Sequence, residues 1–187
     1  MTQMLTSKNA PDIVLVVALT LSRNITRVYD SAGLHYHFRL SYTNTYGRTL
    51  WEYYARTSAP LTRDNVTVFV SNGCCGFMGL QVVAISGASI GQPFDQGQSV
   101  PVKVPCPGPK CGDCTANFNQ GTCSATIRTT GPDLVFASTA INDADPCGAS
   151  DTVSGPSVPG FTNLATNSNF ELDYSITTVP NATVVFH

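Results

Sequence analysis

Four cysteines fall within eighteen residues, from Cys106 to Cys123, in a segment made mostly of glycine, proline and small polar residues. Such a segment cannot continue a helix or a strand, because proline lacks a backbone donor and glycine favours turns. Three further cysteines lie in turn-rich segments, and the long apolar runs contain none. This layout is typical of loops joined by disulfides outside the reducing cytosol. The candidates for disulfide bonding are Cys74, Cys75, Cys106, Cys111, Cys114, Cys123 and Cys147.

A metal site is the alternative for the clustered cysteines. A zinc knuckle usually offers two close cysteine pairs, and only Cys111 and Cys114 form one here. We therefore favour disulfides and expect no cofactor. Cys74 and Cys75 are adjacent and do not easily bond to each other, so one of them is expected to reach Cys147. The seventh cysteine is left free or bonded between subunits, and the connectivity stays open.

The pattern of apolar residues predicts an all-β fold. No window shows apolar residues at helical spacing for three turns, whereas β-branched and aromatic runs recur between turn residues. About 10–11 strands of this kind predict a two-sheet antiparallel β-sandwich, jelly-roll-like, with disulfide-stapled loops. The expected strands are Ile13–Leu21, Thr26–Tyr29, His35–Tyr42, Thr49–Arg56, Asn65–Val70, Phe77–Ser86, Val100–Val104, Ser124–Thr129, Leu134–Ser138, Asn169–Ile176 and Ala182–Phe186.

Periodicity separates two kinds of strand. Val66–Val70 and Phe170–Tyr174 alternate apolar and polar residues, which predicts one buried face. Ile13–Ala18 and Leu80–Ile85 are apolar on both faces, as expected of central strands or of strands covered by a neighbour.

The length of 187 residues fits a single domain. We expect one domain over residues 1–187, with an extended segment at residues 1–10 and a long loop at residues 143–160. No internal repeat or hinge linker interrupts it.

Charge is sparse, and this excludes several partners. Charged residues make up 12% of the chain and the net charge is −2, with ten Lys and Arg that form no basic stripe. We therefore expect no nucleic-acid partner. The apolar run Ile13–Leu19 is far shorter than the roughly 20 residues of a membrane-spanning helix. It follows Pro11 and Asp12 without a basic leader, so we interpret it as a strand and not as an anchor or a signal peptide.

Three Asn-x-Thr sequons are candidates for glycosylation in an exported chain, at Asn24, Asn65 and Asn181. They support an extracellular or cell-surface location, as the cysteines do.

The order of segments resembles a family of secreted or surface β-sandwich modules that occur in archaea and bacteria. The likeness lies in Asp12–Val16, Val28–Leu34, Leu50–Ala55, Ile85–Asp95 and Thr130–Phe136, and it covers most of the chain through short strand-and-turn signatures. The resemblance implies an extracellular, non-catalytic module. The cysteine cluster and the loop around Cys147 depart from the family pattern.

Two histidines flank a tyrosine in His35-Tyr36-His37, which places two imidazoles on one face of a strand about 7 Å apart. Zinc sites use this spacing when a neighbouring strand adds a third ligand, but no third histidine is evident. We therefore favour two solvent-facing histidines, with Tyr36 and Phe38 packing inward.

Aromatic residues alternate in Trp51-Glu52-Tyr53-Tyr54, so Trp51 and Tyr53 share one face. They fill a sandwich core, or together with Tyr46 they form a platform that stacks on a sugar.

No catalytic motif emerges: there is no nucleophile elbow, and no spacing singles out two carboxylates. We expect a protein that is not an enzyme but an extracellular structural subunit, self-associating into a filament, sheath or layer through donated edge strands. The terminal segments Met1–Ser7 and Ala182–His187 are the candidate donors, unless they pair within their own sheets. A carbohydrate-binding or adhesion module is the alternative, with glycans as partners.

Overall fold

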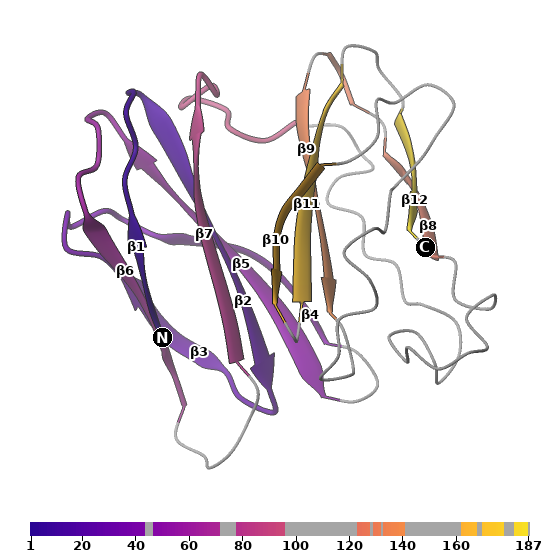
Figure 1. Cartoon of the computed structure of the whole chain (residues 1–187), viewed down its shortest axis with the longest axis horizontal. Coiled ribbons are helices and arrows are strands. Elements are labelled where there is room, and N and C mark those ends of the chain that lie inside the picture. The colour runs from indigo at the N-terminus through magenta and orange to yellow at the C-terminus, as the bar shows by residue number, and fades with distance from the viewer. Residues whose placement is uncertain are drawn as a thin grey trace. The chain divides into compact units, whose positions relative to one another are not determined.

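The computed structural model of the chain (Figure 1) describes residues 1–43, 47–71, 78–95, 123–127, 129–131, 133–140, 162–167, 170–177 and 182–186. Its backbone contacts divide the chain into two compact units, Met1–Pro93 and Phe94–His187. The first unit holds strands β1 to β7 and the second holds β8 to β12. The single domain expected over residues 1–187 stays a prediction.

The described residues are all-β, as the sequence predicts, and every strand pairing among them is antiparallel. In the first unit, β1, β6 and β3 form a three-stranded sheet in that order, and β4, β5, β2 and β7 form a four-stranded one. The strands of this unit are β1 (Thr2–Leu5), β2 (Asp12–Leu21), β3 (Ile25–Tyr29), β4 (His37–Thr43), β5 (Arg48–Thr57), β6 (Asp64–Val70) and β7 (Met78–Ser86).

One hydrophobic core joins these two sheets. Val66 and Val68 of β6 face inward because alternate side chains of a strand point to opposite faces, and they meet Val14 and Val16 of β2. Fully burying such a side chain stabilises the fold by about 1.5–3 kcal/mol. The arrangement is compatible with a β-sandwich. The buried residues of the core are Leu5, Val14, Val16, Ala18, Ala55, Leu61, Val66, Val68 and Val82.

Strand β2 is buried on both faces, as its sequence predicts. It lies between β5 and β7, and the side chains that point away from the core, such as Leu15 and Leu19, are 2% and 1% exposed. Strand β7 shares the apolar pattern but lies at the edge of the sheet. There the Val82 amide donates to the side-chain oxygen of Gln3, at 3.1 Å.

The second unit contains two smaller sheets, one ordered β10, β11, β9 and the other pairing β12 with β8. Val135, Ala137 and Leu172 are buried in it. Its strands are β8 (Cys123–Ile127), β9 (Asp133–Ala140), β10 (Thr162–Asn167), β11 (Phe170–Thr177) and β12 (Ala182–Phe186).

Both terminal strands pair within their own chain. Strand β1 pairs with β6, and the backbone of Met1 exchanges two hydrogen bonds with Val68, each 2.8 Å long. Strand β12 pairs with β8. The sequence leaves two alternatives open for these segments, donation to another subunit or pairing within their own sheets, and the structure has the second.

Most of the strands match the expected ranges, and two are additional. The sequence did not predict β10, and it treated residues 1–10 as an extended segment without placing β1 there. The expected strand Val100–Val104 and the loop at residues 143–160 lie outside the described residues. Among those that are described, no helix is long and apolar enough to cross a bilayer.

Candidate functional site

Three aromatic side chains meet at the edge of the four-stranded sheet, and we call them the aromatic margin: Phe38, Trp51 and Tyr53. Phe38 lies on the edge strand β4 and is paired with Tyr53 of β5. The centroid of the Phe38 ring is 5.4 Å from that of Tyr53 and 6.3 Å from that of Trp51, both edge to face. Phe38 is 54% exposed, which contradicts the expectation that it packs inward.

Trp51 and Tyr53 form the fixed base of the aromatic margin, and both are half-buried. The indole Nε1 of Trp51 donates to the Thr20 hydroxyl at 2.8 Å, and that hydroxyl donates to the carbonyl of Arg23 at 2.7 Å. Tyr53 packs against the core, and burial raises the pKa of its hydroxyl. Tyr53 therefore borders the core and both side chains contact the exposed ring of Phe38, while their role in stacking on a sugar stays a prediction.

The opposite face of the same strands carries a different set of rings. His35 and His37 are exposed, as expected, and their rings stack with centroids 6.3 Å apart. His37 lies 5.3 Å from the Tyr54 ring, and the guanidinium of Arg56 is 6.0 Å from that ring. Within the described residues, no group of three His, Cys, Asp or Glu side chains is placed to hold a metal ion.

A buried carboxylate fixes the turn that leads into β4. One oxygen of Asp30 accepts a hydrogen bond from the Leu34 amide, and the other accepts one from the Tyr36 hydroxyl, both at 2.8 Å. Gly33 adopts a φ of +78° in this turn, a value that other residues rarely adopt. Burial first, then the bond to Asp30 and its charge, raise the pKa of the Tyr36 hydroxyl far above its ordinary value.

A second buried carboxylate, Asp64 at the start of β6, holds the same turn from the other sheet. Its Oδ1 accepts hydrogen bonds from the Ser31 hydroxyl at 2.7 Å and from the Ala32 amide at 2.9 Å. The Ser31 hydroxyl in turn accepts one from the Asn65 amide at 2.9 Å. No pattern in the sequence distinguishes the two carboxylates, Asp30 and Asp64, which are 7% and 3% exposed. Together they position β4, and with it Phe38.

The remaining candidate residues are only partly covered by the structure. Asn24 and Asn65 are both exposed, as glycan acceptors must be. The backbone of Cys123 lies in β8. The candidates outside the described residues are Tyr46, Cys74, Cys75, Cys106, Cys111, Cys114, Cys147, Asn181 and the side chain of Cys123.

Comparison with known proteins adds no family: no family model, no curated protein sequence and no solved structure matches this chain. The resemblance to secreted surface modules stays a prediction. Function is therefore inferred from the geometry of the described residues and from the composition of the sequence.

Proposed function

We propose that this chain is a non-catalytic structural protein of the extracellular space, a subunit that assembles with copies of itself into a filament, sheath or surface layer. Its scaffold is a two-sheet β-sandwich whose loops are joined by disulfides. The composition supports this proposal, because sparse charge and cysteine-rich loops are typical of exported modules with constrained loops.

The observation that carries the proposal is the exposure of Phe38 on an edge strand. A large ring that is 54% exposed, held by two half-buried aromatic residues, offers a preformed apolar contact. Aromatic residues are enriched in interfaces between proteins. Lysines commonly guard exposed edges, yet β4 contains none, and the whole chain has three.

The geometry favours contact through the Phe38 side chain over exchange of a terminal strand. Strands β1 and β12 already pair with β6 and β8, so their donation would require them to leave these partners. Strand β4 has a bulge between Phe38 and Leu40, which bends it and limits long backbone pairing with another strand.

We expect Phe38→Ser to weaken assembly without unfolding the protein, because more than half of this side chain is in contact with solvent. Fully burying a phenylalanine contributes about 1.5–3 kcal/mol, so burying the exposed half of Phe38 contributes about 0.8–1.5 kcal/mol. The association constant should therefore fall by about 4- to 12-fold, as measured by sedimentation velocity over a concentration series.

Ile176→Ser is the matched control, because this side chain is 59% exposed on β11 in the second unit. It should leave the association constant unchanged. An equal loss in both variants, or no loss in Phe38→Ser, would contradict assembly through the aromatic margin.

Carbohydrate binding is the second candidate function, and the same three rings favour it. An exposed aromatic ring beside a half-buried Trp and Tyr is a surface on which a sugar can stack. Pull-down on insoluble polysaccharides separates the two functions. Carbohydrate binding would be favoured if the wild-type protein bound the polysaccharide without ever assembling, and if Phe38→Ser no longer bound it.

A further inference from the structure

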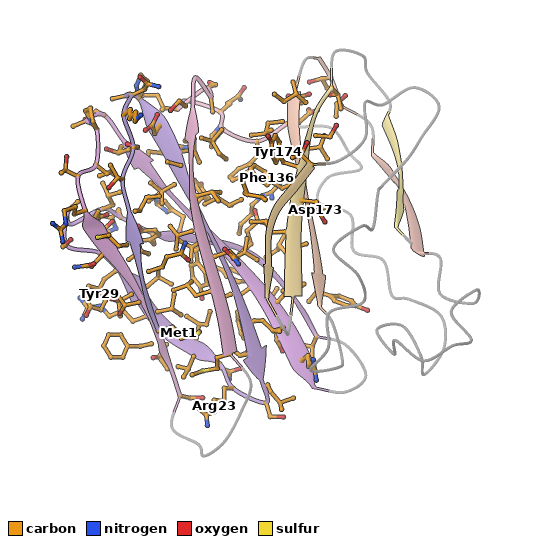
Figure 2. The ribbon with its side chains drawn as sticks, viewed as in Figure 1. Met1, Arg23, Tyr29, Phe136, Asp173 and Tyr174 are labelled. Atoms are coloured by element: carbon orange, nitrogen blue, oxygen red, sulfur yellow. The ribbon has the colours of Figure 1, made fainter. Side chains whose placement is uncertain are left out.

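The outer face of the three-stranded sheet differs from the aromatic margin in its chemistry. Strand β6 alternates, so that Val66 and Val68 enter the core while Asn65, Thr67 and Phe69 point outward. In the neighbouring strands Met4 pairs with Asn65, and Tyr29 pairs with Thr67. Figure 2 shows Tyr29 on the side of this sheet that faces away from the four-stranded one.

Two exposed rings lie nearly parallel on this face. The centroids of Tyr29 and Phe69 are 5.5 Å apart with an angle of 16° between the ring planes, and the rings are 36% and 49% exposed. The guanidinium of Arg27 is 5.0 Å from the Tyr29 ring centroid, and the hydroxyls of Thr2 and Thr67 are hydrogen-bonded at 2.9 Å. Flat apolar rings bordered by donors and hydroxyls match the alternation of C–H and hydroxyl groups on a sugar ring.

The glycosylation sequon at Asn65 lies on the same face as these two rings. In the sequon Asn65-Val66-Thr67 the acceptor and the hydroxyl residue are two positions apart, so both project from the outer face. Tyr29 lies directly across from Thr67, and Phe69 is four residues from Asn65, about 13 Å along the strand. The first sugars of an N-linked glycan span this distance.

We propose that Asn65 carries an N-linked glycan whose first sugar rings lie on the Tyr29–Phe69 pair. This inference rests on the extracellular placement in the proposed function, since N-glycans are added to exported chains. The glycan covers the apolar outer face, including Met4, which is 56% exposed. It thereby blocks contacts between copies on this sheet and leaves the aromatic margin free.

The test compares the two described sequons in protein secreted from a eukaryotic cell line. Peptide mapping should find a glycan at Asn65, and Asn65→Gln should lower Tm by about 2–4 °C, the shift that a loss of about 1 kcal/mol produces in a domain of roughly 150–250 residues. Asn24→Gln is the matched control, because Asn24 is exposed in the loop before β3 and should leave Tm nearly unchanged.

Two further measurements separate a glycan contact from a local effect of the substitution. In protein exported to a bacterial periplasm without N-glycans, Asn65→Gln should leave Tm unchanged. In the glycosylated protein, introducing Phe69→Ser should abolish most of the Tm difference that Asn65→Gln produces. An unoccupied Asn65, or equal Tm shifts for Asn65→Gln and Asn24→Gln, would overturn the inference. Assembly is measured separately, so failure here leaves the role of Phe38 intact.

Discussion

Replacing Asp30 with alanine is expected to lower the free energy of unfolding of the Met1–Pro93 unit by about 3 kcal/mol, because it removes two hydrogen bonds to a charged group. The carboxylate is 7% exposed, so water does not readily replace it. The Leu34 amide and the Tyr36 hydroxyl both lose their acceptor. Urea denaturation followed by tryptophan fluorescence measures the effect, since Trp51 lies in the same unit.

Two further substitutions make this result interpretable. Tyr36→Phe removes one of the two bonds and should cost about half as much as Asp30→Ala. Thr62→Ala changes an exposed residue and should stay within about 0.5 kcal/mol of the wild type. If Asp30→Ala were no more destabilising than Thr62→Ala, the buried carboxylate would not be what fixes the turn before β4.

Leu19→Ala and Val16→Ala are both expected to be strongly destabilising, because β2 is buried on both faces. Leu19 is 1% exposed and Val16 is fully buried on the opposite side of the strand. Truncating a buried leucine to alanine typically costs about 2–5 kcal/mol, through lost contacts and the cavity that remains. Thermal and urea unfolding of both variants provide the measurement.

Strand β6 is the comparison for β2, because only one of its faces is buried. In protein made without N-glycans, Val68→Ala should destabilise the fold because it lies on the one buried face of this strand, whereas Thr67→Ala on the outer face should cost little. If Leu19→Ala were as well tolerated as Thr67→Ala, β2 would be a half-buried strand, with only its core-facing side chains buried.

The sequence predicts strands well where their own side chains decide the structure. The alternation in Val66–Val70 and the double apolar pattern of Ile13–Ala18 predict the positions and the burial of β6 and β2. Strands β1 and β10 were missed because Thr2–Leu5 and Thr162–Asn167 carry weak patterns of their own. They become strands through pairing with β6 and β11.

Features of the site depend on contacts that the sequence does not encode locally. The pairing of Trp51 and Tyr53 on one face follows from alternation, and the sequence predicts it. The exposure of Phe38 was predicted wrongly, because it depends on β4 being the last strand of its sheet. Likewise no sequence pattern marks Asp30 as a structural carboxylate, since its bond to Tyr36 forms only when the turn before β4 closes.

Electron microscopy of the oxidised, secreted protein tests the central claim most directly. We predict regular filaments, sheaths or sheets at concentrations where Phe38→Ser stays largely dispersed. Single monomers of the wild-type protein at every concentration would contradict an extracellular structural subunit that assembles with its own copies.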